Sequence, residues 1–170
     1  MNNPQIVAIF SVMLSNFSFR QSRSTFDTTE TKREIGPVII DFNAIQTKVN
    51  LKYDTLQKAI VQQFGTRLGE DISDFFTNVS KARTELEQQS LEIATTAEAV
   101  TFITYVQGLK RKIKAWERSV DVYRDGQKIL ERQRYQFPTN WLYTDNIDGE
   151  WGAFNEILKR KDGTIQTQVI

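Results

Sequence analysis

The chain has 170 residues, and its 22 Lys and Arg nearly balance 21 Asp and Glu, which gives a formal net charge of +1. It contains no Cys and no His, which excludes disulfides, cysteine zinc sites, thiol nucleophiles and every mechanism that needs an imidazole. The length suits one domain, and only 3 Pro and 8 Gly favour long elements over many short strands, so we expect a helical protein that is not an enzyme.

The amino-terminal residues differ in composition from the rest of the chain. The first 19 carry no charged side chain, and residues 6–14 form an apolar run broken only by Ser11. This run is shorter than the roughly 20 residues that span a bilayer, and no basic residue precedes it as in a secretion signal. We expect residues 1–22 to form an irregular or atypical start.

Turn and strand signals follow. Residues 25–31 are polar and rich in Thr, which predicts a loop, and Gly36-Pro37 predicts a turn. The β-branched run Val38-Ile39-Ile40 favours a short extended segment, which we expect to lie on a helix.

A first long helix is predicted over residues 42–86. Apolar side chains recur there every three or four residues, about 3.7 residues per step, which is typical of one helix face. Asp41 is placed to be its N-cap, and Gly65 and Gly69, each costing about 1 kcal/mol relative to Ala, predict a kink or break. The seam consists of Phe42, Ile45, Val49, Tyr53, Leu56, Ile60, Phe64, Leu68, Ile72, Phe75, Val79, Ala82 and Leu86.

A second helix should begin at Thr95, because Thr95 and Glu98 have the spacing of a capping box. Its seam advances by about 3.5 residues per step, the coiled-coil period, and only Gln127 interrupts it. Phe137-Pro138 should end this helix, since proline biases the preceding residue away from helical geometry. The seam consists of Phe102, Val106, Leu109, Ile113, Trp116, Val120, Tyr123, Gln127 and Leu130.

A third helix should begin near Asp145 or Asn146. Its apolar stripe carries Ile147, Trp151, Phe154, Leu158 and Ile165. No Gly cap or Pro follows before residue 170, which is typical of a helix that is cut rather than finished. The predicted fold is all-α: an elongated bundle of three long helices with a short extended segment and an irregular N-terminus.

We predict no catalytic, cofactor-binding or metal-binding residue. Asn146, Asp148 and Gly149 match three positions of a calcium loop, but Thr144 and Asn155 stand where its first and last carboxylates belong. The pairs Asp71 with Asp74 and Glu85 with Glu87 are assigned to solvated helix faces. No phosphate-binding glycine loop occurs, because the Gly65–Gly69 spacing lies inside a helical pattern.

Three other features allow two interpretations each. The basic clusters at residues 110–114 and 159–161 could contact phosphates or an acidic membrane, but flanking a helix seam favours solvated faces. The aromatic residues Trp141, Tyr143, Trp151 and Phe154 could be an exposed site for a partner, but a plug that closes the end of a bundle is favoured. The glycosylation sequons at Asn16 and Asn78 are interpreted as accidental.

Several long strings are specific enough to compare with known families. They include Arg-Tyr-Gln-Phe-Pro at 134–138 and Gly-Glu-Trp-Gly-Ala-Phe-Asn at 149–155. The others lie at 26–27, 30–32, 36–41, 48–54, 83–88, 99–107, 109–114, 141–143, 145–147 and 160–162. Together they resemble the tail of the cytoplasmic dynein heavy chain over residues 23–170, whereas residues 1–22 do not.

The resemblance implies a non-catalytic piece of a rod of helical bundles that links cargo to a minus-end-directed microtubule motor in the cytoplasm. No catalytic residue is carried over, because ATP and Mg belong to the family's motor region, which this segment does not match. The implied partners are the rest of the heavy chain, a second heavy chain, and the intermediate and light intermediate chains, without nucleic acid or membrane insertion. Two alternatives are a BAR-like membrane-binding helical dimer and a generic spectrin-like coiled-coil scaffold.

Overall fold

The computed structural model describes residues 12, 30–89 and 95–168. Two short strands, β1 (Lys32–Ile35) and β2 (Val38–Asp41), precede three helices: α2 (Asn43–Gln88), α3 (Thr96–Arg132) and α4 (Thr144–Gln168). This confirms the predicted all-α bundle of three long helices. Apart from Val12, the predictions for residues 1–22, the start of the Thr-rich loop and the Asn16 sequon lie outside the described residues.

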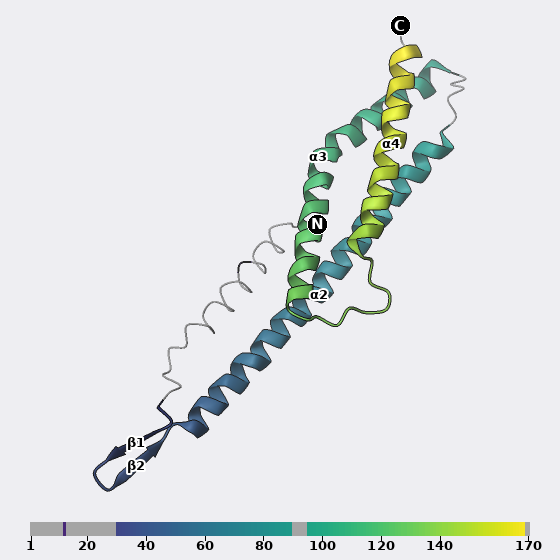
Figure 1. Cartoon of the computed structure of the whole chain (residues 1–170). Helices are drawn as coiled ribbons and strands as arrows, with labels where there is room; N and C mark the ends of the chain where they lie inside the picture. Colours follow the sequence, from purple (N-terminus) through teal and green to yellow (C-terminus); the bar gives the residue numbers. More distant parts are fainter. Residues whose placement is uncertain (1–11, 13–29, 90–94, 169–170) are drawn as a thin grey trace.

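The longest helix, α2, is the axis of the molecule (Figure 1). From residue 61 onwards it is accompanied by α3, which runs back along it, and by α4, which runs in the same direction as α2 (Figure 1). The first part of α2 extends beyond these two helices and ends at the β1–β2 hairpin (Figure 1). The molecule therefore has a three-helix part and a protruding part.

The hairpin corrects one prediction about the β-branched run. Val38–Asp41 pairs antiparallel with Lys32–Ile35, with Ile35 opposite Val38, instead of lying on a helix. Gly36 makes the predicted turn, and its φ of 59° lies in the left-handed region that glycine adopts without strain. Ile35, Val38 and Ile39 are all exposed, so the strands are joined by backbone pairing and not by a core.

The beginning of α2 differs by one residue from its prediction. The N-cap is Phe42, which has helical backbone angles and makes no side-chain cap hydrogen bond. Asp41 is therefore not the N-cap. Its carboxylate nevertheless accepts a hydrogen bond from the backbone N–H of Asn43 at 2.9 Å, as expected for an exposed amide of the first turn.

The predicted break at the two mid-helix glycines is wrong, because α2 continues through Gly65 and Gly69 as one helix. Both glycines face the chain that connects α3 to α4. A Cβ at residue 65 would overlap the ring of Tyr135, and one at residue 69 would lie 2.8 Å from a ring carbon of Trp141. The glycines therefore provide room for aromatic rings, and this packing offsets their poor helix propensity.

The predicted start of α3 is confirmed, whereas its end differs from the prediction. Thr95 and Glu98 form the predicted capping box, with both reciprocal hydrogen bonds present. The helix ends at Arg132, before the predicted stop at Phe137-Pro138. Arg134 adopts a φ of 55°, and the N–H groups of Arg134 and Tyr135 donate to the carbonyls of Glu131 and Leu130. This is a Schellman motif with arginine at the position that usually holds glycine.

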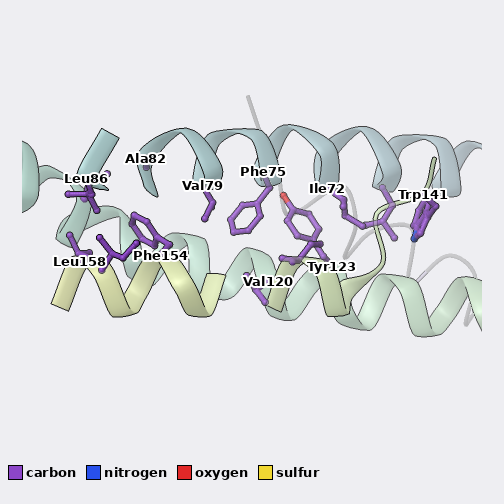
Figure 2. Packing of buried hydrophobic residues seen from close by; sticks show 14 of the residues in the cluster. Ile72, Phe75, Val79, Ala82, Leu86, Val120, Tyr123, Trp141, Phe154 and Leu158 are labelled. Carbon is purple, nitrogen blue, oxygen red and sulfur yellow. The ribbon is translucent and has the colours of Figure 1, made fainter. Parts of the chain in front are cut away.

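One hydrophobic core joins the three helices. Ile72, Phe75, Val79 and Ala82 of α2 face side chains from α3 and α4, with Trp141 at one end of the row (Figure 2). The most deeply buried side chains are Phe64, Leu68, Ile72, Val79, Leu86, Val106, Leu130, Ile147 and Phe154. Rings of Phe75, Trp116, Tyr123, Trp151 and Phe154 pack at centroid distances of 5.4–6.2 Å.

The seam of α2 is covered only in part. Val61 is the first residue of α2 that is buried in the core, and Phe64 is the first buried residue of the seam, whereas Ile45, Tyr53 and Leu56 are exposed. The seam spacing does not change between the two parts. The sequence pattern therefore identifies the apolar face of the whole helix, but α3 and α4 cover only its carboxy-terminal part.

Candidate functional site

The prediction that Asp71 lies on a solvated helix face is wrong. The residue is 4% exposed, and its carboxylate pairs with the guanidinium of Arg67 at 3.1 Å. Burial raises the pKa of the Asp71 carboxyl above its usual range, while the charge of Arg67 opposes this rise. Burial, with the nearby charge of Asp71, also raises the pKa of Tyr123 to about 12. Asp74, the other carboxylate of the predicted pair, is exposed as expected.

In the second carboxylate pair, Glu85 makes a contact between two helices and Glu87 makes one within α2. The Tyr105 hydroxyl of α3 donates to Glu85 of α2 at 2.5 Å, and burial together with this carboxylate raises the pKa of Tyr105. Glu87 is exposed and pairs with Arg83 at 2.8 Å. Arg83 also reaches Glu150 of α4 at 2.6 Å, so this group of charges connects α2 to both other helices.

The calcium-loop match has no loop geometry, because Asn146, Asp148 and Gly149 lie inside α4. Asp148 instead accepts from Arg124 of α3 at 2.8 Å. Within residues 30–89 and 95–168, His, Cys, Asp and Glu side chains nowhere gather in a group of three or more that could hold a metal ion.

Both basic clusters contribute a residue to the bundle. Lys110 of α3 pairs with Asp162 of α4 at 2.8 Å. Lys161 is buried, and its ammonium group donates to the backbone carbonyl of Gln89, the C-cap residue of α2, at 2.6 Å. A cation at a helix C-terminus satisfies an orphan carbonyl and interacts favourably with the helix dipole. Arg111, Lys112, Lys114, Lys159 and Arg160 remain exposed, in agreement with the predicted solvated faces.

The aromatic segment is a plug in the structure. Trp141 is buried against α2, and its ring packs on Phe137 with centroids 4.9 Å apart. The segment lies beside the middle of α2, where α3 ends and α4 begins (Figure 1). It closes that end of the three-helix part, as the favoured interpretation predicted. Trp151 and Phe154 belong to the core, and Tyr143 is exposed.

Gln127, which interrupts the α3 seam, holds this connection in place. Its side-chain oxygen accepts from the backbone N–H of Thr144, the first residue of α4, at 3.0 Å, and from the indole N–H of Trp141 at 3.5 Å. Its amide nitrogen donates to Glu131 at 2.9 Å. The polar residue in an apolar seam thus caps the next helix, a role that the sequence signalled only as an interruption.

An open groove of about 410 Å³ lies between α2 and this connection. Its lining mixes the rings of Tyr135 and Trp141 with polar side chains such as Gln62 and Asn140 and the carboxylates of Glu70 and Asp74. This mixture does not identify a particular ligand or reaction. The groove results from the glycines that admit the aromatic rings.

None of the helices in the described part of the chain combines the length and apolar character that a membrane crossing requires. Another surface feature is the exposed apolar seam on the first part of α2, with Ile45 55% and Leu56 51% exposed. The catalytic, cofactor and metal predictions stay predictions. What the geometry offers is a set of interhelical links and one helix face on which Ile45 and Leu56 are exposed.

Comparison with known proteins gives consistent relatives. The chain is 58% identical over 150 residues to a cytoplasmic dynein heavy chain of Drosophila melanogaster, which covers 88% of this chain. It is 45% identical over 150 residues to the protein of that name from Dictyostelium discoideum, and 41% identical over 158 residues to the one from Caenorhabditis elegans. No family model matches the chain.

The matched region is a small part of each relative. The chain spans 3% of the length of the Drosophila and Dictyostelium proteins and 4% of that from Caenorhabditis elegans. The match nevertheless covers 88% or more of this chain. The chain therefore belongs to the cytoplasmic dynein heavy chains and corresponds to one short segment of such a heavy chain.

Proposed function

We propose that this chain is a non-catalytic scaffold segment of the heavy-chain tail, which links cargo and accessory subunits to the motor. The proposal is supported mainly by the polar side chains that connect the helices to one another. Each pair of helices is joined by at least one charged or charge-assisted contact: Tyr105–Glu85 between α2 and α3, Arg83–Glu150 between α2 and α4, and Lys110–Asp162 between α3 and α4.

Such an arrangement suits a mechanical role better than a chemical one. Three packed helices present their load-bearing backbone hydrogen bonds along the long axis, and the cross-links between helices oppose sliding. A general acid or base needs a side chain that is free to exchange a proton with a substrate in a pocket. The acidic groups of this bundle that meet another helix are instead engaged by Arg, Lys or Tyr.

The similarity to cytoplasmic dynein heavy chains supports a proposal about partners and location. We propose that the segment acts in the cytoplasm on microtubules, within a heavy chain that dimerises and binds intermediate and light intermediate chains. ATP and Mg would act only in the motor region of that heavy chain. Neither nucleic acid nor membrane insertion is part of this role.

The BAR-like alternative has less support. It needs both basic clusters on a lipid-facing surface, but Lys110 is paired with Asp162 and Lys161 is buried against Gln89. Sedimentation with acidic liposomes at low salt distinguishes the two, because a scaffold segment should stay in the supernatant and a BAR-like dimer should pellet. A spectrin-like spacer shares the architecture and differs only in its family.

The experiment is to weaken the bundle within a full-length heavy chain. Phe154→Ala should disrupt the core, because this side chain is fully buried. ATP hydrolysis in solution should stay close to wild type, while transport of a tail-attached bead under load should fall. Lys81→Ala, at a side chain that is 75% exposed, is the control and should change neither. A parallel loss of ATP hydrolysis and transport, or ATP hydrolysis by the isolated chain, would reject the proposal.

A further inference from the structure

We propose that the exposed seam on the first part of α2 is a docking site for an amphipathic helix with an acidic flank, contributed by another segment of the same heavy chain. This docking surface consists of the exposed Ile45, Tyr53 and Leu56 together with the half-buried Val49. The inference rests on the proposed scaffold function, and it adds the identity of the contact that continues the bundle.

Continuity with the core indicates that the occupant is a helix. The docking surface and the buried seam belong to one uninterrupted helix and share the same three-and-four spacing. From residue 61 onwards that face is packed by α3 and α4. Because side chains at this spacing present the ridges and grooves that a helix fills, the same kind of partner fits the docking surface.

Exposure is concentrated in this region. Among the described residues, ten large hydrophobic side chains are exposed, and seven of them lie between residues 35 and 56. The seven are Ile35, Val38, Ile39, Ile45, Leu51, Tyr53 and Leu56. Ile45, Tyr53 and Leu56 share one face of α2, whereas Leu51 lies about half a turn away from that face. Single exposed apolar residues are common on proteins, but neighbouring ones on one face mark an interaction site.

The charged residues beside the docking surface indicate which charge the partner helix carries along its edge. Lys48 and Lys52 follow Ile45 and Val49 by three residues, so they line one edge of the docking surface. Asp54, the acidic residue of this stretch, lies about half a turn away from the surface. A partner helix with Asp or Glu along the matching edge would pair with both lysines, whereas a basic helix would be repelled.

The same charges argue against a second copy of this surface. A two-fold contact places the surface against itself, which brings the lysines of one copy near those of the other. The surface is also short, because residues 45–56 span about 17 Å along a helix, and separate proteins usually bury about 800 Å² per partner. A segment of the same polypeptide needs less contact, since the covalent connection supplies a high effective concentration.

The relatives supply the source of such a segment. This chain spans only 3% to 4% of their lengths, so nearly all of a heavy chain lies outside the residues described by the structure. We therefore assign the occupant to the heavy chain and not to an accessory protein.

Photo-crosslinking in a full-length heavy chain tests this assignment. A benzophenone amino acid replaces Leu56, and mass spectrometry then identifies the crosslinked peptide. The expected result is one dominant crosslink, within a single heavy chain, to a helical segment that carries Asp or Glu beside an apolar stripe. The same probe at Leu51, which is 65% exposed and lies about half a turn away from the docking surface, is the matched control and should give little product.

Charge reversal sharpens the result. Lys48→Glu with Lys52→Glu should lower the Leu56 crosslink yield about fivefold, as expected for two exposed ion pairs converted to repulsion. Lys58→Glu, at a lysine of the same helix that is also exposed but lies on another face, should leave the yield unchanged. All three residues are exposed, so the helix should stay folded, which circular dichroism would check.

Four outcomes would overturn the inference: a crosslink to a second heavy chain, to an accessory protein, to residues 1–29, or to nothing. Each of these leaves the scaffold proposal standing if Phe154→Ala still separates transport from ATP hydrolysis. A failure of that separation, with the expected crosslink present, would instead reject the scaffold function and keep the contact.

Discussion

The two parts of α2 have the same pattern and different surroundings. From residue 61 to residue 86 the seam is buried under α3 and α4, and Leu68, Ile72, Val79 and Leu86 are fully buried. From residue 45 to residue 56 the seam keeps its spacing, but Ile45, Tyr53 and Leu56 are exposed. Periodicity therefore reports which face of a helix is apolar, whereas burial depends on what else the fold brings to that face.

This difference also separates two sources of stability. The covered part gains from apolar burial and from contacts between helices, so substitutions there should act on the folded state. The protruding part gains from helix propensity and from its continuity with the covered part. Matched substitutions in the two parts should therefore give unequal effects, and their comparison tests the account.

The largest difference should come from one substitution made in both parts. Leu68→Ala should lower the free energy of unfolding by about 2–5 kcal/mol, because it leaves a cavity at a fully buried site. Leu56→Ala should change it by less than about 0.5 kcal/mol, because the side chain is 51% exposed. Urea unfolding of the 170-residue chain measures both changes in free energy. Equal losses would show that the protruding seam is already covered.

Two glycine substitutions should change stability in opposite directions. Gly65→Ala should lower it by about 1–3 kcal/mol, because the new Cβ overlaps Tyr135 and the ring must move. Gly152→Ala should raise it by about 0.5–1 kcal/mol, because the site lies in α4 with open space around it. Thermal unfolding compares the two, and a stabilising Gly65→Ala would refute the packing explanation for the unbroken helix.

A smaller effect should separate two lysines of one cluster. Lys161→Met keeps the apolar stem but removes the hydrogen bond to the Gln89 carbonyl, so it should cost about 1–2 kcal/mol. Lys159→Met, at an exposed position two residues away, is the control and should be nearly neutral in chemical unfolding. Equal effects would mean that Lys161 does not cap α2.

The smallest effect concerns pH. Because the pKa of Asp71 is raised, the folded protein binds this proton more tightly than the unfolded chain. The contribution of Asp71 to stability is therefore lost as pH rises through its raised pKa and regained as pH falls towards the ordinary value of 3.8. The unfolding free energy of wild type minus that of Asp71→Asn should become more positive on lowering the pH from 7. The opposite slope would show that Arg67 dominates over burial.

Local signals in the sequence were sufficient for the helices and for one cap. The capping box at Thr95 and Glu98 involves residues three apart, and the start of α4 at Thr144 lies within two residues of its prediction. The hairpin turn at Gly36-Pro37 is equally local. In these cases the groups that determine the structure are neighbours in the chain, so spacing identifies them.

The predictions that were wrong or missing concern residues whose structure depends on contacts that sequence spacing does not reveal. Gly65 meets Tyr135 seventy positions away, so helix propensity alone predicted a break that tertiary packing prevents. Lys161 caps α2 through a backbone carbonyl, which leaves no residue pattern. Arg134 ends α3 by adopting a left-handed conformation that sequence signals assign to glycine. The expected absence of catalytic residues stays a prediction.

Hydrogen exchange along α2 in the isolated full chain tests the central claim most directly, because exchange reports local opening. The account predicts slow exchange for the amides of residues 61–86 and much faster exchange for those of residues 45–58, with a change near the first core residue, Val61. Uniformly slow exchange along the whole helix would contradict it, since the protruding part would then already be held by a partner within the chain.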